Sequence, residues 1–482
     1  MRFQVVDVAA RQKPRAFVFA FALGMGVTLF FQSAVLRAES LPQALVSAYQ
    51  TNPTLNAERA KLRAIDEEIA QARSNYRPSL SADLNTGYRK SSPNLKNKSV
   101  ASGGGFNSGG TNHPQGYSFT ANKTLFRGFR TINAVREARA TINAGRADLR
   151  TVEQTTLLDA VSAYMDVLRD QAIVRLREGN VRVLSEQLKA TKDRFEVGEV
   201  TKTDTAQAEA RRSGAISQLN LAQSNLKTSR AAYERIIGRP PSNLLEPSPI
   251  DGLLPQALQS ALYVAKSENP LIESAEFTEE ASRFAIKQIR GELLPEVSVE
   301  GTYQDTLEPS VTLDRQHVTT LTGRITVPLY SRGEPSSRLR QAVETNRQRI
   351  QEIDQARAQA QSDVIAAWGR VMAARAQIES DQAQVRANKI ALNGVREEEK
   401  VGQRTILDVL DAEQELLDSQ VGLVTTQRER VVATFTLLAA VGRLNVQRLR
   451  LPVEPYDPVE HFDRIQHRWF GKNPDRRGRL GR

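Results

Sequence analysis

Two carboxylates lie three residues apart in the segment that follows Val401 and Gly402. Asp408 and Asp411 would share one face of a helix, because residues three apart on a helix are neighbours. With threefold symmetry these side chains would form two stacked rings of carboxylates, and such rings narrow a pore and select cations. A structural role is the alternative for Asp408, because Thr405-x-x-Asp408 also fits the capping box that opens a helix. Asp411 has no such explanation.

The same pattern occurs earlier in the chain, in an internal repeat. A shift of 204 residues, without insertions, places the first copy on the second: Val197-Gly198 on Val401-Gly402, Thr201 on Thr405, Asp204 on Asp408, and Gly238-Arg239 on Gly442-Arg443. A period this long indicates a duplicated domain rather than a solenoid. Asp411 aligns with Gln207, so the second carboxylate occurs only in the second copy. Each Val-Gly pair is predicted to form the turn at the tip of a helical hairpin.

The composition argues against a metal centre and against enzyme chemistry. The 482 residues include no cysteine and only four histidines, which are scattered through predicted loops and the tail. Thiolate sites and disulfides are excluded, and a zinc site or a histidine-based catalytic site is not indicated. We therefore expect no cofactor and no catalytic activity.

The net charge of +11 is concentrated at the two ends of the chain. Residues 1–38 contribute +4 and residues 461–482 contribute +5, which leaves +2 for the 422 residues between them. The body of the protein therefore lacks the basic face that binding to a phosphate backbone requires, and nucleic acid is not an expected partner.

Residues 1–38 resemble a secretory signal peptide. Basic residues precede an apolar run at 16–31, and Ala38 is a plausible cleavage point. The run is short for a spanning helix, so an uncleaved membrane anchor is the less favoured alternative. No other stretch approaches 18 apolar residues, and we expect no transmembrane helix in the mature chain.

The long helices that must position the carboxylates are indicated by two stretches without proline. Residues 131–239 and 336–451 contain none, although proline in a helix interior costs about 3 kcal/mol. Apolar residues such as Leu157, Val161 and Tyr164 keep the spacing of helices that pack along each other. We expect long helices at about 131–196, 203–238, 336–400 and 405–442.

Proline-containing segments separate the predicted domains. After the signal peptide we expect a first structural repeat at 39–250, a second at 251–452, and a C-terminal tail at 453–482. The tail contains prolines and then many arginines without an apolar period, so it is predicted to be disordered.

Each repeat also contains segments in which apolar and polar residues alternate. Predicted strands lie at about 80–88, 117–126, 296–303 and 321–330, with loops at 89–116 and 304–320. Segments of about ten alternating residues are the signature of an outer-membrane β-barrel. An ordinary half-buried sheet is the alternative, but two matching hairpins behind a signal peptide favour the barrel.

Four strands cannot form a closed barrel by themselves. Open edges are not tolerated in lipid, and about eight strands are the practical minimum for closure. Two copies would give eight strands and a filled interior, whereas three copies would give twelve strands and a lumen. The polar inner faces and the long amphipathic helices favour three.

These features together resemble the TolC family of outer-membrane efflux and secretion ducts. The resemblance covers about residues 40–450 and rests on the Asn-Pro pairs at 52–53 and 269–270, the strand exits at 125–128 and 329–333, and the hairpin tips. It implies a homotrimer with a twelve-stranded β-barrel that continues into a twelve-helix α-barrel. It also implies docking to a periplasmic adaptor (membrane-fusion) protein and to an inner-membrane efflux pump or ABC transporter.

The resemblance also assigns roles at the tips. In the family, Asp residues at the positions of Asp408 and Asp411 form the entrance constriction. Residues matching Arg404, Thr203 and Asp204 help to hold the closed tip together. The family's aromatic partner is replaced here by Glu399, so the closed state is expected to depend more on contacts of Arg404.

We therefore expect a passive duct in the outer membrane, with a long periplasmic extension. A periplasmic coiled-coil adaptor and an envelope scaffold without a pore are the alternatives. An adaptor would carry compact β-rich modules around a single hairpin, whereas this chain has two hairpins. Drug efflux and protein secretion both remain open, because the pump and not the duct selects the cargo.

Overall fold

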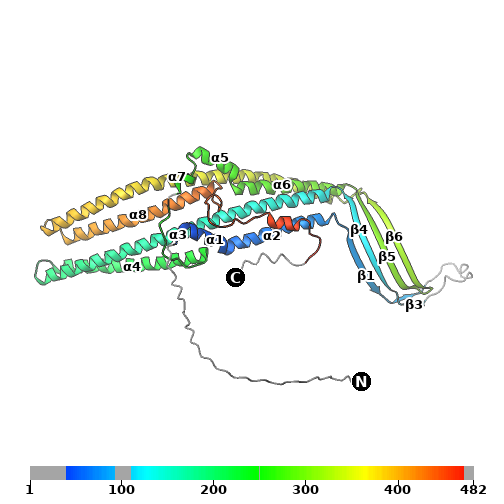
Figure 1. Ribbon diagram of the computed structural model, residues 1–482, viewed down its shortest axis with the longest axis horizontal. Helices are drawn as coiled ribbons and strands as arrows, with labels where there is room; N and C mark the ends of the chain where they lie inside the picture. Colours follow the sequence, from blue (N-terminus) through cyan, green and yellow to red (C-terminus); the bar gives the residue numbers. More distant parts are fainter. Residues whose placement is uncertain (1–38, 93–109, 249, 472–482) are drawn as a thin grey trace, which may run out of the picture. The chain divides into compact units, whose positions relative to one another are not determined.

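The computed structural model describes residues 39–92, 110–248 and 250–471 (Figure 1). The predicted signal peptide at 1–38, the middle of the predicted loop at 89–116, and residues 472–482 lie outside this part.

Both repeats run in the same order, from two short helices through strands to a long helical hairpin. The first repeat consists of α1 (Leu41–Thr51), α2 (Pro53–Ser74), β1 (Ser79–Thr86), β2 (Arg89–Ser91), β3 (Gly110–Asn112), β4 (Gln115–Arg127), α3 (Arg130–Glu196) and α4 (Lys202–Ile237). The second consists of α5 (Leu258–Glu268), α6 (Pro270–Arg290), β5 (Glu296–Ser310), β6 (Leu313–Thr326), α7 (Glu334–Lys400) and α8 (Ile406–Ala440), and α9 (Glu460–Ile465) follows.

An asparagine before a proline starts the second helix of each repeat. The Asn52 side chain accepts a hydrogen bond from the backbone N–H of Thr54 at 2.9 Å, and Pro53 needs no such bond. The same asparagine donates to the carbonyl of Ile236 at 3.0 Å. Asn269 repeats this arrangement in the second copy by donating to the carbonyl of Ala440. In each repeat, the asparagine of the Asn-Pro pair thus joins the two short helices to the end of the long hairpin by a hydrogen bond.

The long helices pack along a seam of buried residues. Helices α3 and α7 have 67 residues each, which corresponds to about 100 Å of continuous helix. On α3 the side chains of Leu157, Val161 and Tyr164 are fully buried against α1 and α4. The Tyr164 hydroxyl lies 2.8 and 2.6 Å from the carbonyl oxygens of Glu39 and Leu245, between which its single proton is shared. Burial raises the pKa of Tyr164 to about 12. None of the helices described here is both long and apolar enough to cross a membrane.

The four main strands form one antiparallel sheet in the order β1-β4-β5-β6. Strands β4 and β5 join the two repeats, with Phe119 opposite Tyr303. Where the chain leaves the sheet, Gly128 adopts a positive φ of 56°, and a Cβ there would lie 2.1 Å from the carbonyl oxygen of Gly291. Only glycine fits this close approach between the two repeats.

The strands of the second repeat differ from the prediction. Residues 304–320 were expected to be a loop, but β5 and β6 run through them and turn at residues 311–312. Strand β6 also ends at Thr326, before the predicted boundary at 330. Charged residues interrupt the alternation of apolar and polar residues in this segment. They fit into paired strands because Arg315 of β6 donates two hydrogen bonds to Asp305 of β5. In the first repeat a short β2–β3 pair lies within the predicted loop at 89–116.

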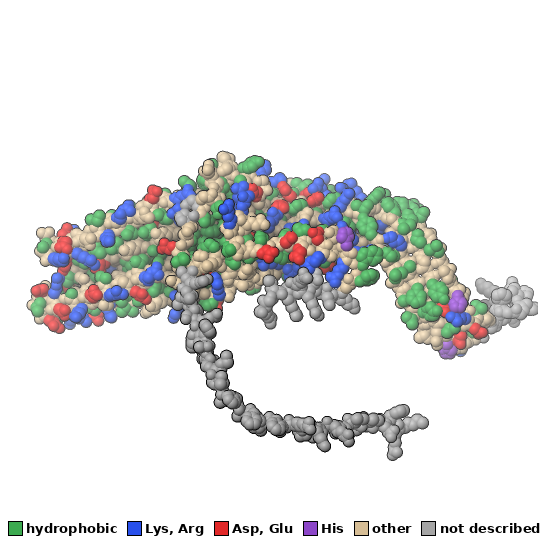
Figure 2. All heavy atoms as spheres, in the orientation of Figure 1, with side chains coloured by type: hydrophobic (Ala, Val, Ile, Leu, Met, Phe, Trp, Pro, Cys, Tyr) green, Lys and Arg blue, Asp and Glu red, His purple; other side chains and the backbone are tan. Residues whose placement is uncertain are grey.

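One face of the sheet is apolar and exposed in the single chain. Leu80 and Leu84 of β1 are 81% and 86% exposed, and Phe119, Leu321 and Ile325 also lie open to solvent. Figure 2 shows hydrophobic side chains gathered over the strands. Exposed apolar surface of this kind indicates contact with a partner or a membrane.

The expectation of a disordered C-terminal tail is wrong for the part that the structure describes. Residues Glu460–Ile465 form α9, and Ile465 is only 2% exposed because it packs with Ile69 and Ile142. His461 Nδ1 lies 3.1 Å from an oxygen of the buried Asp66 carboxylate. Burial raises the pKa of Asp66, and the hydrogen bond with His461 opposes this shift.

The packing of α9 predicts the effect of shortening Ile465. Ile465→Ala should destabilise the fold by about 2 kcal/mol, because it leaves a cavity beside Ile69, whereas Ile465→Val should cost about 1 kcal/mol. Thermal melting followed by far-UV circular dichroism measures both. Identical melting of the alanine variant and the natural chain would show that α9 does not pack on α2 and α3.

Candidate functional site

The candidate site is the pair of hairpin tips, which we define as residues 194–204 and 398–411. Gly198 and Gly402 have φ values of 80° and 78°, in the left-handed region that favours glycine. Their N–H groups donate to the carbonyls of Phe195 and Glu399 at 3.0 and 2.9 Å. Both tips therefore turn in the same way, at the residue pairs proposed from the sequence: Val197-Gly198 and Val401-Gly402.

Asp408 and Asp204 both cap the helix that follows their turn. The Asp408 carboxylate accepts a hydrogen bond from the backbone N–H of Thr405 at 2.9 Å, and the Thr405 hydroxyl accepts from the N–H of Asp408 at 3.2 Å. Thr201 and Asp204 make the same capping box at the start of α4. The bonds from Thr405, with a smaller contribution from the charge of Arg404, lower the pKa of Asp408. This carboxylate is held ionised at the opening of α8.

Asp411 lies one turn further along α8 and pairs across to the other hairpin. Its carboxylate forms an ion pair with Arg211 of α4. The two side chains are about half exposed, so the pair is weak by itself. Asp411 is therefore both a charge at the tip and a contact between the two repeats.

Within residues 39–92, 110–248 and 250–471, Arg404 and Thr203 form no hydrogen bond or ion pair between the two hairpins. Arg404 Nε donates to Glu398 at 2.9 Å within its own tip, and this partner raises the pKa of Arg404. Thr203 is exposed on the first turn of α4. The roles of Arg404, Thr203 and Asp204 in holding a closed tip stay predictions for the assembled protein.

Glu399 forms a link that the sequence interpretation missed. Arg194 of α3 donates to Glu399 of α7 at 2.6 Å, and the Glu399 side chain is only 14% exposed. The signal was present in the repeat alignment: the 204-residue shift places Arg194 on Glu398 and Phe195 on Glu399. Arg194 and Glu399 thus lie at adjacent positions of the repeat and carry opposite charges, which allows the two hairpins to pair.

An apolar contact supports these ion pairs. Leu184 and Ala215 of the first hairpin pack against Ile406 and Leu410 of the second. All four side chains are buried, so separating the hairpins would expose them to water. The tips are therefore held by one apolar cluster and two ion pairs.

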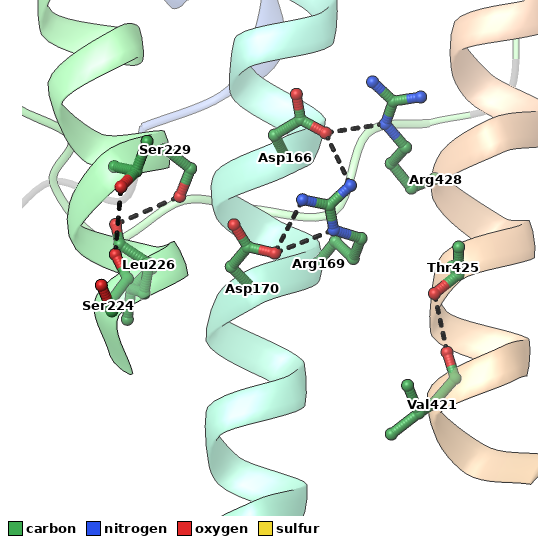
Figure 3. Close-up of polar contacts among 10 residues, drawn as sticks. Asp166, Arg169, Asp170, Ser224, Leu226, Ser229, Val421, Thr425 and Arg428 are labelled. Carbon is green, nitrogen blue, oxygen red and sulfur yellow. Dashed lines mark hydrogen bonds and ion pairs between the residues drawn. The ribbon is translucent and has the colours of Figure 1, made fainter. Parts of the chain in front are cut away.

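A second set of ion pairs joins the hairpins further from the tips, between α3 and α8 (Figure 3). Arg428 of α8 donates to Asp166 of α3 at 2.9 Å. Arg169 lies between Asp166 and Asp170 and pairs with both carboxylates at 3.0 and 2.8 Å. Arg428 therefore joins the two hairpins through Asp166, and Arg169 pairs with the same carboxylate from its own helix.

The model of the outer membrane efflux protein family matches residues 44–239 and 261–443. The chain belongs to this family. The outer membrane efflux protein BepC of Brucella suis biovar 1 (strain 1330) is 36% identical over 463 residues, which are 95% of this chain and 97% of BepC. The outer membrane protein TolC of Salmonella enteritidis is 25% identical over 442 residues, which are 88% of this chain and 86% of TolC.

The same fold occurs among solved structures. The CmeC outer membrane channel of Campylobacter jejuni superimposes with a TM-score of 0.76 over 89% of each chain, at 15% sequence identity. The predicted family and the predicted mainly helical, duplicated fold are thus confirmed. The protein described here is a duct in the outer membrane that serves efflux or secretion. Its helical hairpins form a periplasmic extension.

Proposed function

We propose that three copies of the chain form one passive duct from the periplasm across the outer membrane, without catalytic activity. The observation that carries this proposal is the open sheet, in which β1 and β6 are edge strands of the part of the chain that is described. The sheet has an exposed apolar face suited to lipid, and lipid does not tolerate unpaired edges. Pairing β1 of one copy with β6 of the next would give the backbone groups of both edge strands hydrogen-bond partners.

Three copies are favoured over two by the size of the resulting pore. Twelve strands would enclose a lumen, whereas about eight strands close around a filled interior. The face opposite the apolar one carries Asp83, Asn122, Glu300 and Arg324, which suit an aqueous lumen. Six helical hairpins would then continue the channel as a twelve-helix α-barrel.

The hairpin tips supply the periplasmic entrance in this proposal. Six carboxylates from Asp408 and Asp411 would line it, and Arg404, Thr203 and Asp204 would hold neighbouring tips together. A periplasmic adaptor and an inner-membrane efflux pump or ABC transporter would deliver the cargo. The membership in an efflux family supports this division of labour, since a duct has no energy source of its own.

Assembly and conduction are tested with the full-length protein. Native mass measurement in detergent should give three chains, and planar bilayers should show discrete conductance steps. Cross-linking in whole cells should add a periplasmic and an inner-membrane protein to the trimer. A stable monomer that retains its strand content, or a trimer that never conducts, would contradict the duct.

A further inference from the structure

A cavity of about 450 Å³ lies away from the tips, where the two repeats meet the C-terminal segment. We define this C-terminal segment as residues 445–458. Helices α1, α2, α3 and α6 contribute the other walls, which include the apolar side chains of Leu55, Leu149 and Phe277. None of the duct functions described above uses this cavity.

Arg59 of α2 is a buried cation in the wall of the cavity. The residue is only 7% exposed, and its guanidinium group lies over the rings of Tyr49 and Tyr456 at 4.4 and 5.2 Å. Its Nη1 donates to the side chain of Asn56 at 3.0 Å. Its Nε is buried and has no hydrogen-bond acceptor within the described part of the protein. No carboxylate forms an ion pair with Arg59 there.

Arg146 of α3 is a second cation in the same wall. Its Nη1 donates to Asn143 at 3.3 Å, and the guanidinium group lies 5.2 Å from the ring of Phe462. Its Nε and Nη2 are buried and have no acceptor among residues 39–92, 110–248 and 250–471. Burying charged donors without acceptors is unfavourable, so both arginines favour an anion in the cavity.

The carboxylates that line the cavity have other partners than Arg59 and Arg146. Glu273 forms an ion pair with Arg150. Glu153 accepts a hydrogen bond from the backbone N–H of Val446 at 3.1 Å. Burial raises the pKa of Glu153, and this hydrogen bond and the charges of Arg59 and Arg150 oppose the shift. Asp66, which is not part of the cavity wall, lies 3.1 Å from His461 Nδ1. The charges of Arg59 and Arg146 lower the pKa of Glu153 and of Asp66, respectively, so these carboxyl groups lie near the two arginines. Even so, Arg59 Nε and the Nε and Nη2 of Arg146 have no hydrogen-bond acceptor in the described part of the protein.

We propose that this cavity binds a small organic phosphate monoester. Two guanidinium groups with free N–H donors match the oxygens and the double negative charge of such a group. The apolar walls formed by Leu55, Leu149 and Phe277 would receive the organic part of the ligand. Because Tyr456 and Val446 belong to the wall, the ligand would also fasten the C-terminal segment to the two repeats.

Calorimetry with phenyl phosphate tests this site on the full-length protein in detergent at low salt. We expect saturable binding with one site per chain, and no binding of benzyl alcohol, which has the ring without the anion. Arg146→Gln should weaken binding by about tenfold or more, since a charge-assisted contact is lost. The matched control is Arg182→Gln, an exposed arginine on the same helix, and it should leave the affinity unchanged.

Hydrogen exchange on the natural chain gives a readout that does not depend on any variant folding. Phenyl phosphate should slow amide exchange in residues 445–458, while inorganic phosphate at equal concentration should do so less because it lacks the apolar part. Absence of saturable binding, equal affinity in Arg146→Gln, or unchanged exchange in the C-terminal segment would overturn the proposal. The arginines would then be solvated by water inside the cavity.

Discussion

Replacing Asp408 and Asp411 together with asparagine is expected to abolish the cation selectivity of the channel and its block by divalent cations. Rings of carboxylates attract cations, and a divalent ion neutralises several of them at once. Asparagine retains a side-chain oxygen that can accept the bond from Thr405, so the cap on α8 should survive. The cation-to-anion permeability ratio from reversal potentials should fall toward about 1.

The pH dependence of selectivity distinguishes the two aspartates. In Asp411→Asn only Asp408 remains, and the hydrogen bonds from Thr405 lower the pKa of this carboxylate. Its charge is present above that lowered pKa and is lost as the pH falls through it. Selectivity of this variant should therefore persist through the usual aspartate range near about 3.9 and disappear only below it.

A control near the tips separates the entrance from the general surface charge. Glu209 is exposed on α4, and the repeat shift matches it to Glu413, two residues after Asp411. Residues two apart do not share a helix face, so Glu209→Gln removes an equal charge away from the proposed rings. This variant should keep its selectivity. Natural selectivity and divalent block in the double asparagine variant would mean that Asp408 and Asp411 act only as a helix cap and as a partner of Arg211.

Glu399→Gln is expected to raise the open probability of the channel. It removes the carboxylate that accepts from Arg194 across the two hairpins. The Arg194 side chain is 43% exposed, so we discount the pair to about 1 kcal/mol. Three such pairs in a trimer would contribute about 3 kcal/mol, enough to shift a closed-to-open equilibrium by roughly a hundredfold.

Single-channel recording measures this shift directly. Exchange of the two charges in the double variant Arg194→Glu with Glu399→Arg should restore much of the closed state, because the pair can form again. The matched control is Glu397→Gln, which removes a carboxylate whose ion-pair partner among the described residues is Lys400 on the same helix. Equal open probability in Glu399→Gln and Glu397→Gln would show that the Arg194–Glu399 contact does not hold the tips closed.

Features that depend on neighbours in the chain could be predicted from the sequence. The capping box of Thr405 and Asp408 requires residues three apart, and the turn at Gly402 requires one residue with a positive φ. The absence of proline and the heptad spacing indicated the long helices for the same reason. The duplication was visible in the sequence because both copies use the same residue types at the same turns and helix caps.

Features that depend on how the two repeats pack were decided only by the tertiary structure. Arg194 and Glu399 are 205 residues apart, and Arg211 and Asp411 are 200 apart, so no local spacing marks them as pairs. The packing of Ile465 against α2 and α3 could not be predicted from the sequence either. Six helical residues in a basic tail show too little periodicity to indicate a buried face. The sequence by itself determined the helices and the turns, since these follow from short-range backbone physics, and its motifs resembled those of the family to which the chain belongs. The partners of the charged side chains were determined by which surfaces the folded hairpins bring together.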